Sequence, residues 1–363
     1  MNQDGVTRRE FVQHTAAAAA GAAAGAGLIG QTAAESPAAE TPAAKVPAAP
    51  PDPTKTRSYN ENMEYRRLGR TGLMVSAVGI GGHVKKIPFG WNSPEFKKNR
   101  REVLAACIDH GINYADPCGA GEVLFVAEAL GKNREKMYLG FDWWGARDPN
   151  IAGNLNRMKE QLDTGLRDAK LEYVDLWRVT MREQTSRNSE KEIETVAQAL
   201  EWAKKTGKAR FTGLSTHHRP WIAAAVAKYP AFEVIVTPYS AGSNAKPEGS
   251  MFEALRKYDV GLIGIKPFAS GTIFKSGGTP DSATKQEDDE RGRLAIRHVL
   301  STDALHCTIP GLITIDQVKN AVAAVKERRQ FDLAETERLE QMVREMWDNL
   351  PHAYRWLREW QWV

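Results

Sequence analysis

Eight short apolar runs alternate with longer stretches of helical periodicity from about residue 63 onward, and this alternation constrains the fold more than any other feature. The runs are 76–82, 112–116, 137–141, 173–179, 209–214, 232–239, 260–265 and 305–310. The helical stretches between them include 99–111, 154–169, 190–207 and 316–329. The runs are almost continuously apolar, as expected of parallel strands covered on both faces. The pattern predicts an α/β fold, a (β/α)8 TIM barrel over residues 63–330.

An open, doubly wound sheet is the competing fold for such an alternation. That fold usually carries a glycine-rich phosphate loop directly after its first strand. Here the first run ends in Gly79–His83, and no further G-x-x-G helix start follows. Residues 25–30, GAGLIG, do match the dinucleotide fingerprint, but no strand precedes them and no βαβ unit surrounds them. The match therefore reflects the Ala/Gly-rich composition of this segment and does not indicate a dinucleotide site.

Two short segments flank the predicted barrel. Residues 63–76 are predicted to form a β-hairpin that plugs the bottom of the barrel, with its turn at 69–72. Residues 331–363 are predicted to form a C-terminal extension of two helices separated by a proline. Trp356 and Trp360 share one face of the second helix. We expect them to pack against the protein, with a lid over the barrel mouth as the alternative.

The N-terminus is predicted to lie outside the folded domain. Residues 1–34 combine a basic start, an Ala/Gly-rich middle and a small-residue end, which is typical of a removable export signal. The pair Arg8-Arg9 followed by Phe11 resembles the twin-arginine signal, whose export machinery carries folded proteins. A disordered Ala-rich tail is the alternative, and no stable membrane anchor is expected because Ala and Gly have little transfer energy. Residues 35–57 are predicted to be an extended Pro/Ala-rich linker.

The composition excludes several classes of partner and site. The net charge of +4 is small for a chain of 363 residues, so no nucleic acid partner is expected. The three cysteines are widely spaced without a C-x-x-C pair, so neither a disulfide framework nor a cysteine metal knuckle is expected. Together with the N-terminal signal, these features predict a periplasmic or otherwise exported protein that acts on a small molecule.

Functional side chains of a (β/α)8 barrel come from the carboxyl ends of its strands, where the loops converge over the barrel axis. The side chains that this rule selects are Asp116, Cys118 and Glu122 after the second strand, Asp142, Trp143 and Trp144 after the third, Arg178, Thr180 and Arg182 at the fourth, Ser215, Thr216, His217 and His218 at the fifth, Thr237, Tyr239 and Ser240 at the sixth, Lys266 at the seventh and Gly311 after the eighth.

Seven segments that follow one another along the chain carry a family resemblance. They are EYRRLGRTGLMVSAVGIGG, GINYAD, LEYVDLWRV, GKARFTGLSTH, TPYS, GLIGIKPFASG and IPGLITIDQV. In this order they resemble the aldo-keto reductases. The resemblance implies that an extended NAD(P)H gives hydride to a carbonyl while a tyrosine hydroxyl protonates the forming alkoxide. In that family a lysine paired with an aspartate lowers the pKa of the tyrosine, and a histidine orients the substrate.

Compared with that family, this sequence retains the aspartate and departs at the other three catalytic positions. Asp116 matches the aspartate, but no tyrosine follows it before the next helix. Asp142 stands at the position of the lysine, and Thr180 at that of the histidine. Asp116 and Asp142 are expected to lie close together, which raises one pKa or recruits a cation. The catalytic candidates are Asp116, Asp142 and His217.

The resemblance also implies a partly retained site for NAD(P). Ser215 matches the residue that holds the nicotinamide amide, and Thr216 follows it in place of an asparagine. Tyr239 matches the aromatic that stacks on the ring, whereas Val236 replaces a glutamine. Gln317 stands where many NADP-preferring members have an arginine. Further contacts are expected by position from Ser240, Lys266, Gly311 and Asn320.

Two other functions stay open at this point. In one, a divalent metal for lyase or hydrolase chemistry is bound by Asp116, Glu122, Asp142 and His217. In the other, the barrel is a binding protein without turnover. Trp143 and Trp144 would suit stacking on a sugar ring. A redox role outside the cytoplasm requires a cofactor that is bound before transport and kept through turnover, which a signal for folded proteins allows.

Overall fold

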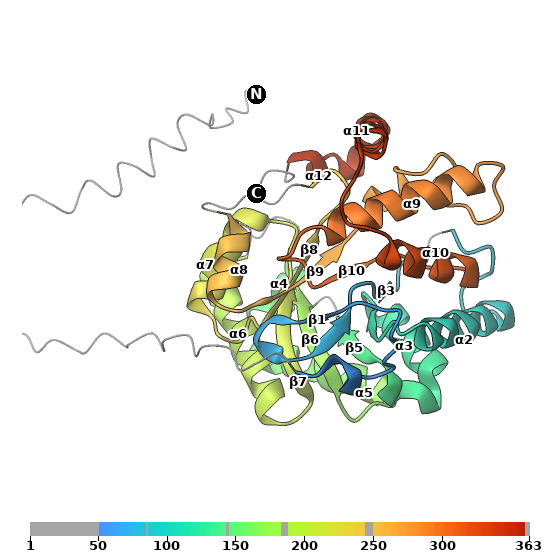
Figure 1. Cartoon of the computed structure of the whole chain (residues 1–363). Helices are drawn as coiled ribbons and strands as arrows, with labels where there is room; N and C mark the ends of the chain where they lie inside the picture. Colours follow the sequence, from blue (N-terminus) through green and yellow to red (C-terminus); the bar gives the residue numbers. More distant parts are fainter. Residues whose placement is uncertain (1–50, 85, 143–144, 183–187, 244–249, 360–363) are drawn as a thin grey trace, which may run out of the picture. The chain divides into compact units, whose positions relative to one another are not determined.

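The computed structural model describes residues 51–359, apart from residue 85, 143–144, 183–187 and 244–249 (Figure 1). The predicted signal and most of the predicted linker therefore lie outside the described residues, as do Trp143, Trp144 and Trp360.

Eight parallel strands form the barrel, in the order β10-β9-β8-β7-β6-β5-β4-β3. Their bounds are β3 Ile80–Gly81, β4 Tyr114–Asp116, β5 Tyr138–Phe141, β6 Val174–Thr180, β7 Ala209–Ser215, β8 Val234–Pro238, β9 Gly261–Ile265 and β10 Cys307–Ile309. An isolated parallel bridge between Val78 and Thr308 connects the segment before β3 to β10. The predicted TIM barrel is confirmed, although the first predicted strand, 76–82, is reduced to β3 plus this bridge.

Helices alternate with the strands and surround the sheet (Figure 1). The α-helices are α2 Pro94–Asp109, α3 Ala120–Leu130, α4 Pro149–Ala152, α5 Leu155–Asp168, α6 Glu190–Lys205, α7 Arg219–Lys228, α8 Met251–Lys257, α9 Lys285–Leu300, α10 Ile315–Lys326, α11 Leu333–Asp348 and α12 Trp356–Glu359. The 3-10 turns are η1 Pro53–Lys55, η2 Gly69–Thr71, η3 Gly131–Lys136, η4 Gly145–Arg147, η6 Ala269–Gly271 and η7 His352–Tyr354.

Two helix starts bring side chains of the predicted site to the barrel mouth. Gly119, with a φ of 93°, allows the sharp turn from β4 into α3, so that Glu122 lies in the first turn of α3. His218 is the N-cap of α7, and Pro220 follows in the first turn where its missing N–H costs nothing.

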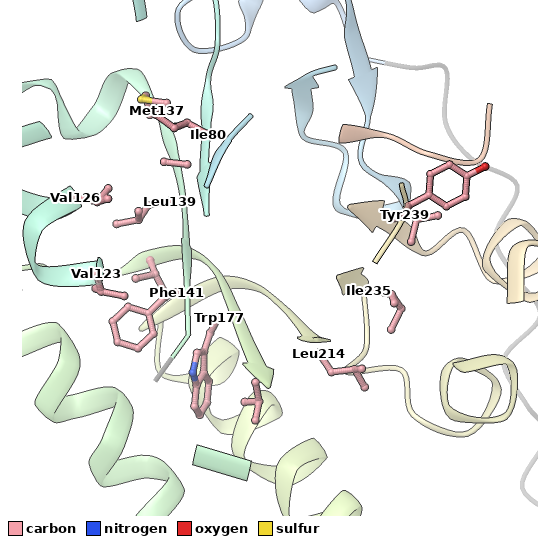
Figure 2. Packing of buried hydrophobic residues seen from close by; sticks show 14 of the residues in the cluster. Ile80, Val123, Val126, Met137, Leu139, Phe141, Trp177, Leu214, Ile235 and Tyr239 are labelled. Atoms are coloured by element: carbon pink, nitrogen blue, oxygen red, sulfur yellow. The ribbon is translucent and has the colours of Figure 1, made fainter. Parts of the chain in front are cut away.

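Two apolar layers stabilise this architecture. The inner layer packs Leu68, Leu73 and Val75 of the N-terminal segment against strand residues such as Tyr114, Leu176, Val234, Val236 and Ile263. The outer layer places Leu139, Phe141 and Trp177 of the strands beside Val123 and Val126 of α3 (Figure 2). Burying one such side chain contributes about 1.5–3 kcal/mol.

The predicted hairpin is present below the strands. β1 (Tyr65–Arg67) pairs antiparallel with β2 (Met74–Ser76), and η2 forms the turn. Gly69 has a φ of +49°, and a Cβ there would lie 2.3 Å from the backbone nitrogen of Gly261, so the turn needs a glycine. The hairpin covers the amino end of the barrel and leaves the carboxyl end for a functional site.

The predicted linker 35–57 is wrong at its C-terminal end, because Arg57 docks onto the barrel. Its guanidinium donates to the carbonyl of Met137 at 2.8 Å and to Asp175 Oδ2 at 3.0 Å. Asp175 is completely buried and also pairs with Arg134 and Arg210. A Pro-rich composition indicates an extended chain, but it does not predict that the arginine at its end pairs with a buried carboxylate.

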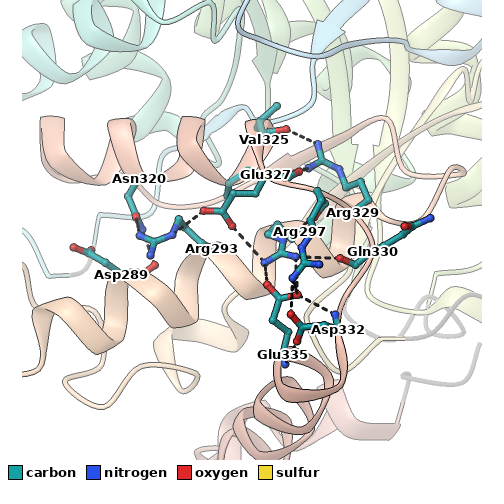
Figure 3. Close-up of polar contacts among 12 residues, drawn as sticks. Asp289, Arg293, Arg297, Asn320, Val325, Glu327, Arg329, Gln330, Asp332 and Glu335 are labelled. Carbon is teal, nitrogen blue, oxygen red and sulfur yellow. Dashed lines mark hydrogen bonds and ion pairs between the residues drawn. The ribbon is translucent and has the colours of Figure 1, made fainter.

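The C-terminal extension is held by an ion-pair network between α9, α10 and α11 (Figure 3). Arg297 of α9 donates to Glu335 of α11 at 2.8 Å and to the carbonyl oxygen of Arg328 at 2.8 Å. After α11 the chain continues through η7 and the short α12, so the predicted second helix is only one turn long within the described residues. None of the described helices is both long and apolar enough to cross a membrane.

Candidate active site

A cavity of about 580 Å³ lies at the carboxyl ends of the strands, a volume typical of ligand sites. Its walls combine strand ends, the loop after β9 and the C-terminal extension. Eight of the predicted site residues line it, namely Asp116, Ser215, Thr216, His217, Lys266, Gly311, Gln317 and Asn320. The barrel rule therefore selected residues that the fold brings together in one cavity. Their position alone does not decide what each residue does there.

The floor of the cavity is a buried ion cluster centred on Arg178 of β6. Arg178 Nε and Nη2 donate to both oxygens of Asp116, at 2.8 and 2.7 Å. Arg178 Nη1 also reaches Asp142 Oδ2 at 3.3 Å. The Arg178 and Asp116 side chains are each only 2% exposed, and that of Asp142 is fully buried. Burial opposes the charge of Arg178, but Asp116 and Asp142 outweigh it and raise the pKa of Arg178 well above its usual value.

Asp142 lies beneath the cavity and is absent from its lining, so the prediction that it acts directly on a ligand is not supported by this geometry. Its carboxylate accepts hydrogen bonds from the hydroxyl and backbone nitrogen of Thr180, at 2.5 and 3.2 Å. The thiol of Cys118 donates to the same carboxylate at 3.3 Å. Asp142 thus completes the surroundings of Arg178.

The expected neighbouring carboxylates do recruit a cation, but it comes from the chain itself. Sequence reasoning placed Arg178 at a strand end and assigned it no role. A signal was available: an arginine inside a continuously apolar strand needs a buried counterion, and an aspartate stands at the end of the second strand and directly after the third.

A tyrosine does contact Asp116, although it lies in the barrel core. The hydroxyl of Tyr114 donates to Asp116 Oδ1 at 2.9 Å, and its ring is fully buried. Burial, reinforced by the charge of Asp116, holds the pKa of Tyr114 well above its usual value. A Cβ on Gly140 would lie 2.6 Å from this hydroxyl, so the glycine makes room for it. Tyr114 is not part of the cavity lining.

His217 forms part of the cavity wall beneath the C-terminal extension. Its ring stacks on the indole of Trp356 with centroids 4.3 Å apart and planes inclined by 13°. Its Nδ1 is buried and has no hydrogen-bond partner among the described residues. Burial, with repulsion from cations including Lys266 and Arg147, lowers the pKa of His217 to about 3. His217 is therefore a neutral imidazole at ordinary pH.

A second histidine, His83, follows β3 on the rim of the cavity. Its Nδ1 forms a hydrogen bond with Glu122 Oε1. The other oxygen of Glu122 accepts from the backbone nitrogen of Cys118 at 2.8 Å. A Cβ on Gly82 would lie 1.9 Å from Glu122 Oε2, so the glycine admits this carboxylate. Sequence reasoning weighed Glu122 only as a metal ligand and gave His83 no role.

The cavity has a cationic lining. Among the described residues, five cationic side chains line it, namely Lys86, Arg147, Arg178, Lys266 and Lys285. Three carboxylates oppose them, namely Asp116, Asp288 and Asp289. Two of these carboxylates are already paired, Asp116 with Arg178 and Asp289 with Lys285. The lining therefore contains more cationic than anionic side chains, and this excess favours an anionic ligand.

The chain after β9 is conformationally strained where it lines this cationic wall. Lys266, Ala269 and Ser270 have φ values of 59°, 44° and 64°, in the left-handed region that non-glycine residues rarely adopt. Such strain is concentrated at ligand-binding and catalytic sites.

Comparison with known proteins decides the family. The sequence model of the Aldo/keto reductase family matches residues 85–344. This chain belongs to that family. L-galactose dehydrogenase of Arabidopsis thaliana is 24% identical over 288 residues, which cover 73% of this chain and 89% of that protein. The oxidoreductase YrpG of Bacillus subtilis is 24% identical over 73% of this chain and 91% of its own.

Solved structures support the fold of this aldo-keto reductase. The holo form of an aldo-keto reductase from Bacillus halodurans aligns with a TM-score of 0.59 at 21% identity, over 81% of this chain and 99% of that one. An aldo-keto reductase of Pseudomonas aeruginosa aligns with a TM-score of 0.57 at 18% identity, over 75% of this chain and 96% of that one.

The lining of this aldo-keto reductase fits NAD(P), which the family generally uses. The cationic wall suits a diphosphate. Gly311 keeps the backbone accessible, because a Cβ there would lie 2.7 Å from the carbonyl oxygen of His83. Residues that would hold the dinucleotide are Ser215, Thr216, Lys266, Gly311, Gln317 and Asn320. Bound there, it supplies or accepts a hydride.

Two predicted cofactor contacts do not reach this cavity, and their prediction is corrected. The ring of Tyr239 is 1% exposed and packs on Phe252, and its hydroxyl bonds to Thr302 Oγ1 at 2.7 Å. Ser240 is equally buried, and its hydroxyl accepts from the backbone nitrogen of Gly242 at 3.3 Å. Both residues follow the end of β8, and neither lines the cavity, which the sequence match did not reveal.

Two other predicted contacts line the cavity but already serve the fold. Gln317 Oε1 accepts from the backbone nitrogen of Ile313 at 2.8 Å, which fixes the start of α10. Asn320 Oδ1 accepts from Arg293 at 2.6 Å, and its Nδ2 donates to the carbonyl of Asp289 at 2.9 Å. A ligand would therefore share these amides with protein partners.

The predicted metal site finds no support in this geometry. Within residues 51–359, excluding the gaps given above, no group of three His, Cys, Asp or Glu side chains is arranged to hold a metal ion. Asp116 and Asp142 are instead bonded to Arg178, and Glu122 to His83.

Proposed function

We propose that this protein is an exported aldo-keto reductase that interconverts a sugar-type carbonyl and its alcohol with a tightly held NAD(P). The observation that carries the proposal is the cavity at the strand ends, which combines a cationic wall with the Asp116–Arg178 floor. A diphosphate suits the wall, and the floor lies where the family holds its catalytic aspartate. The family itself supports hydride transfer as the reaction.

Aromatic side chains and one relative support a sugar-type substrate. Tyr354 and Trp356 of the C-terminal extension line the cavity, and flat rings of this kind stack well on the apolar faces of sugars. L-galactose dehydrogenase is a relative whose name states a sugar substrate. We infer a polyhydroxylated carbonyl compound or alcohol as the substrate class.

We also infer that the catalytic set is degenerate. Asp142 and Thr180 occupy the positions expected for the family's lysine and histidine, and Arg178 provides a cation beside Asp116. A fixed positive charge at this position would stabilise a developing oxyanion, as the lysine does in the family.

The N-terminal sequence supports export in the folded state. Residues 1–34 carry the Arg8-Arg9 pair ahead of an uncharged Ala/Gly-rich segment. Replacing both arginines by lysine should leave the protein in the cytoplasm, as fractionation and blotting would measure. Unchanged export of that variant would remove the twin-arginine pathway from the proposal.

Mass spectrometry of natively purified, exported protein tests cofactor retention directly. We expect NAD(P) at near one equivalent per chain, together with turnover of a sugar aldehyde or sugar alcohol when an electron acceptor or donor regenerates the cofactor. Absence of nucleotide, combined with no shift in melting temperature on adding NADH or NADPH, would contradict the proposal.

A binding protein without turnover is the second candidate. Asp116 already accepts three hydrogen bonds, two from Arg178 and one from Tyr114, and this engagement within the protein favours the second candidate. Ligand-dependent melting by sugars, with no hydride exchange to a bound nucleotide, would support this candidate over the reductase.

A further inference from the structure

The reaction proposed above needs a group that gives a proton to the carbonyl oxygen, and several nearby groups are unsuited to it. Tyr114 is fully buried outside the cavity. His217 has a pKa lowered to about 3, first by burial, and therefore carries no extra proton at ordinary pH. Asp116 is bonded to two partners and accepts from both. The donor must be a cavity residue that both holds and releases a proton.

The pair formed by His83 and Glu122 has the arrangement that such a donor requires. Glu122 accepts from His83 Nδ1, and an ionised carboxylate can only accept, so the proton of that bond lies on the imidazole. A carboxylate that fixes one ring nitrogen in this way leaves Nε2 for a reactant. The side chain of His83 is 47% exposed, so it exchanges protons with solvent, whereas that of Glu122 is only 13% exposed.

The pair is connected to the ion cluster at the cavity floor. Glu122 accepts from the backbone nitrogen of Cys118, and the thiol of the same cysteine donates to Asp142. Asp142 in turn contacts Arg178, which holds Asp116. A continuous chain of hydrogen bonds and ion pairs therefore fixes the position of His83 and Glu122 relative to the charge that would stabilise an oxyanion.

We propose that His83 is the proton donor and acceptor of this aldo-keto reductase, and that Glu122 is its positioning residue; this rests on the proposed function. In reduction, a nicotinamide held in the cavity would supply the hydride of the new C–H bond. The π electrons of the carbonyl move to oxygen, and that oxygen takes the proton of His83 Nε2 as the N–H bond breaks. His83 becomes neutral and regains a proton from solvent. Alcohol oxidation runs the same transfers in reverse.

Tyr354 is the rival donor, because it also lines the cavity and its ring lies 5.7 Å from the Lys266 ammonium. The structure favours His83 because its orientation is set by Glu122, a largely buried carboxylate within the same network as Asp116. Tyr354→Phe removes the rival hydroxyl and keeps the ring, so it separates the two assignments.

Kinetics of the cofactor-loaded protein test the donor. His83→Gln should lower kcat by about 100-fold or more, as expected for loss of a general acid, with nucleotide affinity within about twofold. His110→Gln, a control at the C-cap of α2 outside the cavity lining, should retain kcat within about threefold. Tyr354→Phe keeps the ring that lines the cavity and should lower kcat far less than His83→Gln does. Added imidazole should restore part of the kcat of His83→Gly. Full activity of His83→Gln, or a Tyr354→Phe loss as large as predicted for His83, would overturn the assignment.

Nitrogen NMR of histidine-labelled protein tests the pair without turnover. His83→Gln assigns the resonances, and the proposal requires a proton on Nδ1 of neutral His83. Glu122→Gln should weaken that tautomer preference and lower kcat by about tenfold, with little change in KM. A proton found on Nε2 alone, or no response to Glu122→Gln, would refute the pair even if the protein reduces carbonyls. An intact pair in a protein that holds nucleotide but transfers no hydride would refute the proposed function, and the role of His83 with it.

Discussion

Arg178 is the residue on which the electrostatics of the cavity floor depend. Two carboxylates and one guanidinium lie almost completely out of water, and each carboxylate has Arg178 as a partner. Transferring such groups from water is costly, so the cluster is stable only while all partners are present. Removing Arg178 would leave two buried carboxylates without a counterion. That cost is larger than the net stabilisation that the intact ion pairs provide.

Replacing Arg178 by methionine should destabilise the fold by about 3–5 kcal/mol, because two buried carboxylates lose their counterion. Urea unfolding at pH 7 measures this change. The matched control is the triple variant Asp116→Asn, Asp142→Asn, Arg178→Met, which removes all three charges and should recover most of the loss. If Arg178→Met lowers the unfolding free energy by less than about 1 kcal/mol, the ion pairs of Arg178 are no stronger than exposed surface pairs, which contradicts the prediction.

His217 makes stability depend on pH in a predictable direction. Burial lowers its pKa to about 3 from 6.5, so between these values the unfolded chain binds a proton that the folded protein does not. The contribution of His217 is thus complete above pH 6.5 and declines as the pH falls toward 3, with a slope of up to about 1.4 kcal/mol per pH unit.

The variant His217→Phe, which retains an aromatic ring against Trp356, should flatten the dependence of unfolding free energy on pH between 6 and 4. Urea titrations at several pH values give that slope. His352→Gln, at an exposed position of η7, should leave the slope as in the parent protein. Equal slopes for His217→Phe and the parent would mean that His217 takes up its proton in the folded state.

At the scale of elements, the C-terminal extension both packs against the barrel helices and forms part of the cavity wall. Arg297 and Glu335 fix α11 on α9 (Figure 3). The chain then returns so that Trp356 covers His217. Both alternatives considered for the aromatic residues therefore hold in part, since Trp356 packs on a histidine and lines the cavity at once.

Truncating Trp356 to alanine should raise the pKa of His217 from about 3 toward 6.5, because the indole supplies much of the burial that disfavours the imidazolium. Proton NMR of the histidine ring would follow this titration. Trp356→Phe keeps a stacked ring and should hold the pKa low. If both variants titrate alike, the strands and loops rather than α12 bury His217.

Helices and strands could be predicted from sequence where the hydrophobic period and the length of the apolar run indicate the same element. Where the two disagree, the predicted bounds are less accurate. β6 and β7, seven residues each, lie almost where the apolar runs predict. The first run, 76–82, was too long, because Ser76 belongs to the hairpin and the chain then bends before β3. Tyr239 shows the limit for site residues, since a strand-end position does not say which way a side chain points.

At the scale of the molecule, the cavity entrance, called the mouth below, is lined by cationic side chains although the whole chain has a small net charge. Sequence predicted its place, because the fold dictates which strand ends converge. It did not predict the Arg178 cluster or the His83–Glu122 pair, because both connect segments far apart in the chain through side chains whose directions only the folded barrel sets.

Inorganic pyrophosphate should stabilise the protein through this mouth, by about 2.7 kcal/mol at one hundred times its Kd. Differential scanning fluorimetry at low ionic strength measures the shift, which added salt should reduce. Lys266→Met should weaken the effect, whereas Lys319→Met, an exposed position on α10 outside the cavity lining, should not. Equal losses in both variants would indicate binding to the general surface charge instead.

The junction between β3 and β10 has a consequence for how the barrel fluctuates. It rests on the Val78–Thr308 bridge and a few backbone bonds, such as Gly81 to Pro310 at 3.0 Å, whereas β6 and β7 share a ladder along their whole length. Transient opening should begin at this junction, so its amides should exchange with deuterium before those of β6. Since His83 and Gly311 follow directly from its two edges, each such breathing event also changes the shape of the mouth through which a ligand enters.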